Sequence, residues 1–453
     1  MAYRTLVTFS LALTAASPAL GQLRVATFDV DASPPVGSPL AYDPTKAVQT
    51  PLSCRGVVLT GSGKPVVLCA VDWIGIGNDG QRVFRESLAK AAKTETGRVA
   101  VHTLHQHDAP DCDLTVDAML ADVGLKGQRY DSAFGRDVIN RAAKAVGDAT
   151  ENARPVTHLG LGEAIIEKVA SNRRILGEDG KVKYVRYTAC RDPKIRAAPV
   201  GTIDPKLKLI ALYNGDKPLA VLTYYATHPQ SYYRTGLANP DFPGLARNAR
   251  QKESGVFHVH FNGAGGNVGA GKWNDGSKEN RRILADRVAS GMKAAWERVK
   301  RTPITADDVG WGSAVVHLPP ADHIDKAKNI ALLNDEKADP GARVLAAREL
   351  VWLNRCENKD GIDVSCLTLG TARVLHMPGE LFVEYQLAAQ KMRSDLFVAM
   401  AAYGEYAPGY IGTEIAYSQG GYETSPRASR VAPPVEGVLT EAMRTLLGAE
   451  QRD

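Results

Sequence analysis

The stretch VAVHTLHQHDAP, residues 99–110, runs from an apolar strand pattern directly into a polar cluster. Its first half alternates β-branched residues, and Ala109 and Pro110 interrupt the pattern just after the cluster. Residues two apart on a strand point to the same face, so His105 and His107 are predicted to face one pocket. Neutral imidazoles held in this way suit Zn²⁺, which takes nitrogen ligands at about 2.0–2.1 Å. The pattern favours a metal site at a strand end, with two structural histidines that cap the strand as the alternative.

Similar strand patterns continue outward in both directions. Strand-like runs rich in Val, Leu and Thr occupy residues 56–61, 65–73, 157–166, 207–214 and 218–228. Helical periodicity occurs at residues 79–94, 132–151, 278–301, 343–354 and 381–396. This mixture predicts an α/β fold with mixed β-sheets and surrounding helices. Because no long Gly/Ser linker divides the chain, residues 22–453 are expected to form one domain, with residues 319–363 as a polar, mostly helical surface excursion.

The first 21 residues have the pattern of a secretory signal peptide. Arg4 supplies a positive charge, a short apolar run follows, and residues 19–21 form a small-x-small cleavage pattern. The apolar run is too short to cross a bilayer, and no later stretch is long and apolar enough to do so. The mature chain is therefore expected to start near Gln22 and to be secreted or periplasmic.

Composition and motifs exclude two classes of partner. The chain has 55 Lys and Arg against 50 Asp and Glu, well mixed, and without a basic stripe it is not expected to bind nucleic acid. Residues 266–272 match the G-x-x-x-x-G-K pattern, but Trp273 stands where a P-loop needs Ser or Thr for magnesium. Nucleotide binding is therefore not expected, and the glycines are interpreted as allowing close approach of backbone to a ligand.

Six cysteines are present, and export would permit disulfide bonds. Cys356 and Cys366 flank a polar loop and are the predicted pair. Cys54 and Cys69 lie in apolar strand patterns and are interpreted as core thiols.

Three further segments carry candidate functional groups. His228 follows the apolar run 218–227 and precedes a proline, which places it at a predicted strand end. Pro378 is suited to open a helix, so Glu380 is predicted to lie in that helix's first turn, where its charge is favoured anyway. The Gly- and Pro-rich loop 403–423 carries five tyrosines that could pack, bind a metal or polarise a carbonyl group: Tyr403, Tyr406, Tyr410, Tyr417 and Tyr422.

These segments resemble, in order and setting, the catalytic N-terminal domain of the neutral/alkaline ceramidases. Residues 103–110 look like that family's T-H-T-H-S-G-P segment, NRRILG at 172–177 resembles its N-R-S-P motif, and MPGE at 377–380 matches its P-G-E motif. YATHPQS and NPDFPG resemble the strand with the second zinc histidine and the segment after it. Tyr410 and Tyr422 are twelve residues apart, like the family's two active-site tyrosines.

The resemblance implies a zinc hydrolase that cleaves an amide, or N-acyl, bond with a metal-activated water. The zinc ligands that it implies are His105, His228, Glu380 and Tyr410. His107 and Arg173 would line the pocket near the metal, and Tyr422 would bind the substrate carbonyl group.

The chain departs from the family pattern in two places. Gly269 stands where ceramidases have an active-site Ser, and Asn267 stands where they have an Asp. The chain also stops about thirty residues after Tyr422, so the family's C-terminal β-sandwich domain is expected to be missing. Both departures argue against ceramide itself as the substrate.

Other functions stay open at this point. A carbohydrate derivative such as an N-acyl sugar is an alternative substrate, because Asn262, Asn267, Lys272, Trp273 and Asn274 suggest a polar pocket floor. A non-catalytic metal-binding homologue is another alternative. A metallo-β-lactamase-like H-x-H-x-D-H motif is ruled out by Ala109.

Overall fold

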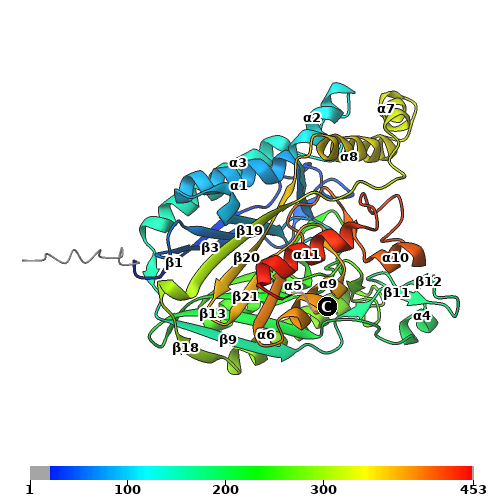
Figure 1. Cartoon of the computed structure of the whole chain (residues 1–453). Helices are drawn as coiled ribbons and strands as arrows, with labels where there is room; N and C mark the ends of the chain where they lie inside the picture. The colour runs from blue at the N-terminus through cyan, green and yellow to red at the C-terminus, as the bar shows by residue number, and fades with distance from the viewer. Residues whose placement is uncertain (1–20, 451–453) are drawn as a thin grey trace, which may run out of the picture.

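Three β-sheets form the framework of the molecule, a computed structural model that describes residues 21–450 (Figure 1). The first has the strand order β6 (Val99–Thr103), β4 (Val66–Val71), β3 (Ser53–Thr60), β1 (Arg24–Asp31), β8 (Arg154–Pro155). The second runs β16 (Phe257–Asn262), β14 (Lys217–Tyr225), β13 (Lys206–Asn214), β9 (His158–Ile165), β18 (Lys300–Pro303). The third runs β19 (Val309–Val316), β20 (Ile362–Leu369), β21 (Ala372–His376), β23 (Phe397–Ala401). Each combines antiparallel pairs with one parallel pair, which confirms the predicted mixed sheets.

Helices pack against each of these sheets. α1 (Asp79–Ala92) and α3 (Ser132–Glu151) contact the first sheet, α5 (Asp241–Ser254) and α6 (Lys278–Glu297) the second, and α9 (Val383–Met392) and α11 (Val435–Leu447) the third (Figure 1). Apolar residues at helical spacing explain the packing, since α3 buries Val138, Ile139, Ala142 and Val146 along one face. The predicted helices at 79–94, 132–151 and 343–354 are confirmed. The helix predicted at 278–301 ends at Glu297, before strand β18, and the helix predicted at 381–396 spans only Val383–Met392.

The three sheets share one apolar core. Buried residues from all of them meet in a single cluster that includes Val57 and Leu68 of the first sheet, Ile210 and Leu222 of the second, and Leu367 and Val374 of the third. Burying these branched side chains contributes roughly 1.5–3 kcal/mol each. The ends of the central strands are thereby held in fixed relative positions.

Short two-stranded ribbons join loop segments outside the three sheets. The described residues form five of them. Two matter for the site: β10 (Ser171–Asn172) pairs with β17 (Val268–Gly269), and β22 (Glu380–Leu381) pairs with β24 (Tyr410–Ile411). The others pair β11 (Arg174–Leu176) with β12 (Val182–Val185), β2 (Ala47–Val48) with β15 (Leu237–Ala238), and β5 (Gly75–Gly77) with β7 (Asp111–Asp113).

The remaining helices lie toward the surface. α7 (Lys326–Asn334) and α8 (Pro340–Glu357) project beside α2 (Leu114–Asp122), as expected for the excursion at 319–363 (Figure 1). The excursion nevertheless has an apolar core of its own, because Val344, Ala347 and Leu350 of α8 pack with Leu120 of α2. The short helices α4 (Pro193–Ala197) and α10 (Glu414–Gln419) complete the set, with 3₁₀ turns at Thr96–Arg98 and Ala306–Asp308.

The predicted disulfide between Cys356 and Cys366 is wrong. All six cysteines, each within residues 21–450, are free thiols. Cys356 lies in the last turn of α8, whereas the chain has already entered β20 at Ile362 and carries Cys366 into the sheet. Cys54 and Cys69 are fully buried with their sulfur atoms 3.5 Å apart, as expected for core thiols.

Within residues 21–450, no helix has the length and apolar character needed to cross a membrane. The predicted signal peptide lies, up to residue 20, outside the described residues.

Candidate metal centre and cavity

His105 lies in a strained loop rather than on a strand. β6 ends at Thr103, and His105 adopts a left-handed backbone conformation with φ of 62°. Its backbone N–H donates to the Trp73 carbonyl oxygen at 2.9 Å, and its Nδ1 donates to the Ile74 carbonyl oxygen at 2.6 Å. The expectation that His105 and His107 project from one strand face is therefore wrong. Strain of this kind persists only where the surroundings fix it, and here it aims Nε2 of His105 inward.

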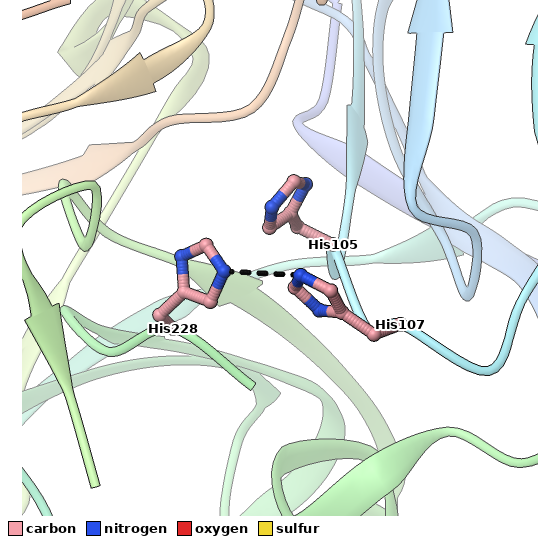
Figure 2. A group of neighbouring side chains, drawn as sticks. All are labelled: His105, His107 and His228. Atoms are coloured by element: carbon pink, nitrogen blue, oxygen red, sulfur yellow. Dashed lines mark hydrogen bonds between the residues drawn. The ribbon is translucent and has the colours of Figure 1, made fainter. Parts of the chain in front are cut away.

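Three histidines meet at this point (Figure 2). The ring centroids of His105, His107 and His228 lie 4.7–5.1 Å apart, and all three side chains are buried. His228 follows β14, and its backbone N–H donates to the Val268 carbonyl oxygen at 2.8 Å. Nε2 of His228 lies 3.3 Å from Nε2 of His107, and these three histidines could together hold a metal ion.

Glu380 joins the cluster from a strand, which corrects the prediction of a helical first turn. It lies in β22 opposite Tyr410 of β24, and α9 begins only at Val383. Its Oε2 is 3.1 Å from Nε2 of His105 and 3.8 Å from Nδ1 of His228. The Tyr406 hydroxyl donates to its Oε1 at 3.2 Å.

The hydrogen-bond pattern of these groups fits a bound cation. Nδ1 of both His105 and His107 donates to a carbonyl oxygen, which leaves the Nε2 of each neutral ring with a free lone pair. His228 can then donate to His107 and turn its own Nδ1 lone pair toward Glu380. Among residues 21–450, His105 Nε2, His228 Nδ1 and Glu380 Oε2 have no hydrogen-bond partner although they are buried. With His105 neutral, the three converging lone pairs repel one another unless a metal cation lies between them, and in the metal-free protein a proton on His105 can take that place.

Arg173 contacts Tyr410 and Glu423 at the wall of the site. It follows β10, and its Nη1 donates to the Tyr410 hydroxyl at 2.9 Å while its Nε lies 3.2 Å from Oε1 of Glu423. Arg173 and Glu423 are 2% and 0% exposed, so this ion pair is shielded from solvent. The pair fixes the Tyr410 hydroxyl beside Glu380.

Burial and mutual charge set the protonation states. Burial lowers the pKa of His107 and of His228 well below its ordinary value, and the neighbouring His105 lowers both further. Burial opposes ionisation of Glu380, but His105, Tyr410 and Arg173 outweigh it, so the pKa of Glu380 is lowered. His107 and His228 are therefore neutral and Glu380 is charged at neutral pH, the states that ligate metals.

A cavity of about 430 Å³ opens beside the cluster. Its lining includes six of the seven residues that the sequence singled out, namely His105, His107, Arg173, Glu380, Tyr410 and Tyr422. The seventh, His228, does not line the cavity but contacts His105 and His107. The ring centroid of Tyr422 lies 5.8 Å from that of Tyr410, so its hydroxyl-bearing ring forms one wall. The structure thus brings all seven residues together.

The polar floor expected from the Gly-rich segment is not part of this cavity. Nζ of Lys272 donates to the carbonyl oxygens of Arg196 and Ala198 at 2.9 and 2.6 Å, so it holds a loop in place and is not available to a phosphate. Trp273 and Asn274 are absent from the cavity lining, and Asn274 is buried. The glycines instead allow close packing, because a Cβ on Gly266 would lie 2.2 Å from the Glu380 carbonyl oxygen.

Sequence reasoning assigned no specific role to several residues of the site. Tyr406 binds Glu380 and Glu423 binds Arg173, and both lie in the tyrosine-rich loop, which was a usable signal. Tyr42, Tyr233 and Thr188 also line the cavity, but each comes from a different loop without a motif.

The fold and the site define a class: mixed α/β proteins with a buried histidine–carboxylate cluster beside a cavity of about 430 Å³. Two solved structures share this fold. A ceramidase complexed with C2 matches with a TM-score of 0.67 and 13% identity over 94% of this chain and 75% of its own. A neutral ceramidase from Pseudomonas aeruginosa matches with a TM-score of 0.67 and 14% identity over 94% of this chain and 74% of its own.

The chain therefore has the neutral ceramidase fold, as the sequence motifs predicted. No protein-family model matches the sequence, and the search of curated proteins gives no significant match.

Proposed function

We propose that this chain is a zinc-dependent hydrolase that cleaves an amide bond of an N-acyl substrate. The observation that carries the proposal is the set of three unpartnered, converging atoms on His105, His228 and Glu380, all within the described residues, at a cavity large enough for a small ligand. The ceramidase fold supports the reaction class.

We assign the metal ligands as His105, His228, Glu380 and Tyr410. His107 is close enough to replace one of them, but its two ring nitrogens already lie 3.2 Å from the Pro229 carbonyl oxygen and 3.3 Å from His228. Glu380 adds the negative charge that offsets the positive charge of a divalent ion. When bound, Zn²⁺ would supply Lewis-acid chemistry, lowering the pKa of water and polarising the substrate carbonyl group.

The remaining groups would lie around the substrate. His107 would line the cavity wall next to the metal, with its ring nitrogens held by the Pro229 carbonyl oxygen and His228. The Tyr422 hydroxyl would donate a hydrogen bond to the carbonyl oxygen as negative charge develops there. Arg173 would hold Tyr410 in place and add positive charge behind it.

An N-acyl sugar is a second candidate substrate, and the cavity lining favours it over a long-chain lipid. The lining contains six tyrosines, and among the described residues its only aliphatic side chain is Ala189. Tyr42, Tyr187 and Tyr233 are 41%, 48% and 46% exposed, so their ring faces are accessible to a ligand. Half-exposed aromatic rings with arginines nearby suit a polar ring better than an alkyl chain.

We also propose that residues 22–453 act as one domain and that the protein is exported after cleavage near residue 21. This rests on the sequence of the N-terminal segment. N-terminal sequencing of the exported protein tests it, and a mature chain that retains residues 1–21 contradicts it.

Elemental analysis of the purified protein is the first test. We expect about one zinc ion per chain, and its loss in His105→Ala. His260→Gln is the matched control, because His260 is equally buried but has Thr223 at 2.8 Å and Asn262 at 3.2 Å as partners. A wild-type protein that takes up no metal after incubation with zinc would overturn the proposal.

Activity is then measured on N-acylsphingosines, N-acyl sugars and simple N-acyl aryl amides, with and without a chelator. Chelator-insensitive turnover contradicts the zinc mechanism. Zinc binding without turnover of any of the three supports the non-catalytic alternative.

A further inference from the structure

We propose that Thr188 supplies a hydroxyl that hydrogen-bonds the amide group of the substrate in this cavity. The inference rests on the proposed function, and it assigns a specific contact to a residue that no motif marked. Thr188 lies in the loop between β12 and α4 and lines the cavity together with Arg173 and Tyr422.

The Thr188 hydroxyl is buried without a partner. The residue is 1% exposed, and within residues 21–450 its Oγ1 has no hydrogen-bond partner. Leaving a buried hydroxyl unpaired costs about 1–3 kcal/mol, so native structures rarely do so without a reason. A ligand in the cavity that Thr188 lines would supply the missing partner.

Hydrogen bonds hold the backbone of this loop in place. Nδ2 of Asn274 donates to the Thr188 carbonyl oxygen at 2.9 Å, and the Cys190 backbone N–H donates to the Asn274 carbonyl oxygen at 2.9 Å. The Arg186 backbone N–H donates to the Arg173 carbonyl oxygen at 2.7 Å on the other side. The backbone that carries the hydroxyl is therefore fixed before any ligand arrives, which limits the entropy lost on binding.

Gly269 makes room for the hydroxyl. A Cβ added to Gly269 would lie 3.1 Å from Thr188 Oγ1 and 3.7 Å from the Arg173 side chain. Gly269 pairs with Ser171 and bridges to His228, so this space adjoins the proposed metal centre. Position 269 is also where the sequence resemblance expects a serine. This space has room for one hydroxyl group. The Thr188 hydroxyl and a serine hydroxyl at position 269 could not both occupy it.

The sharpest test therefore moves the hydroxyl from position 188 to position 269. We expect Thr188→Val to lower kcat/KM on N-acyl substrates about 10-fold, which is the loss of one hydrogen bond, with zinc content unchanged. Thr188→Ser keeps the hydroxyl and should restore the wild-type value to within about threefold. The double variant Thr188→Ala with Gly269→Ser returns the hydroxyl from the other side, and we expect it to recover activity that Thr188→Ala loses.

Thr227→Val is the matched control. Thr227 is also a fully buried threonine whose hydroxyl has no partner in the described chain, but it does not line the cavity. Equal losses in Thr188→Val and Thr227→Val would reduce the effect to general packing and overturn the assignment. Failure of the double variant to exceed Thr188→Ala would overturn the shared-space argument.

Binding separates this inference from the proposed function. The affinity of the zinc-loaded protein for acetohydroxamate, measured by calorimetry, needs no turnover. We expect Thr188→Val to weaken binding about 10-fold and Thr188→Ser to restore it. If no N-acyl substrate is hydrolysed but this pattern holds, the amidase proposal fails and the Thr188 contact stands. If substrates are hydrolysed and Thr188→Val matches wild type in both assays, the Thr188 contact fails alone.

Discussion

Two buried charged clusters in this molecule differ in how completely their atoms are paired. Asp72 and Arg247 are 0% and 1% exposed, and both carboxylate oxygens of Asp72 accept hydrogen bonds from Arg247, at 2.7 and 2.9 Å. The backbone N–H and hydroxyl of Ser53 each add one at 2.8 Å. Around Glu380, which is equally buried, His105 and His228 instead face Oε2 with unpartnered nitrogens within the described chain.

The difference distinguishes a structural cluster from the cluster that we propose to bind a metal. A buried charge costs several kcal/mol unless it is paired, and the Asp72 cluster meets that cost within the protein. Burial disfavours the Asp72 carboxylate, but Arg247 and Ser53 outweigh it and lower its pKa. In the proposed function, a bound cation would complete the pairing of the Glu380 cluster. Removing a member should therefore cost stability in the first cluster and ligand binding in the second.

Glu380→Gln should produce the largest effect. The substitution keeps the shape but removes the charge, so zinc affinity should fall by more than the roughly 10–100-fold that outer-shell partners cost. The free energy of unfolding of the metal-free protein should fall by less than it does in Asp72→Asn, because Glu380 accepts one hydrogen bond, from Tyr406, whereas Asp72 accepts four. Metal titration and urea denaturation measure the two quantities, with Glu384→Gln as a nearby control. Unchanged zinc affinity would contradict the ligand assignment.

Asp72→Asn should show the opposite profile. It leaves the Arg247 charge buried and unpaired, which should lower the free energy of unfolding by about 3–5 kcal/mol. Zinc stoichiometry of the folded fraction should be unchanged. Asp29→Asn serves as the comparison, since Asp29 pairs with Arg55 at 2.8 Å but is 35% exposed, and such pairs contribute about 0–1 kcal/mol. Similar losses in the two variants would refute the distinction drawn between the clusters.

Tyr422→Phe should separate chemistry from metal binding. We expect kcat/KM to fall about 100-fold, the effect of losing one donor to a developing oxyanion, while zinc content stays the same. Tyr417→Phe is the control, because Tyr417 lies in the same loop but places its hydroxyl 3.1 Å from Ser429 and does not line the cavity. Full activity of Tyr422→Phe would exclude the proposed carbonyl contact.

The sequence predicted which residues meet at this site better than it predicted how they are held. His105, His228 and Glu380 were identified, but two of their local structures were wrong. The H-x-H pattern indicated a strand, whereas hydrogen bonds to Trp73 and Ile74 hold His105 in a left-handed turn. Pro378 indicated a helix start, whereas pairing with Tyr410 keeps Glu380 extended. In both cases, tertiary contacts overrode local propensity.

What the sequence could not predict depends on contacts between distant loops. Thr188 and Tyr42 reach the cavity from segments without any motif, and only the folded sheets place them there. The cysteine error has the same origin. Spacing alone favoured Cys356 with Cys366, but strand β20 begins between them and separates the two sulfur environments.

Asp241 is an intermediate case between the Asp72 and Glu380 clusters. Its substitution should have the smallest effect of the variants considered. It is fully buried and accepts hydrogen bonds only from neutral groups, namely the Ser231 hydroxyl and the backbone N–H groups of Tyr232 and Phe242. Burial raises its pKa from the ordinary 3.8 to about 6, because these donors offset only part of the desolvation.

The folded state therefore binds the Asp241 proton more tightly than the unfolded state does. The stabilisation is fully present below about pH 4 and is lost as pH rises toward 6, by at most about 3 kcal/mol for a shift of about two pKa units. Asn cannot titrate and tolerates the left-handed backbone at this position, where φ is 50°. Urea denaturation of wild type and Asp241→Asn between pH 4 and 7 should show the variant gaining stability relative to wild type as pH rises, whatever its offset at pH 4. If the stabilities of wild type and variant instead change in parallel with pH, neutral donors suffice to pair a buried carboxylate. The contrast between Asp72 and Glu380 would then lie in the number of hydrogen bonds and not in the presence of a cation.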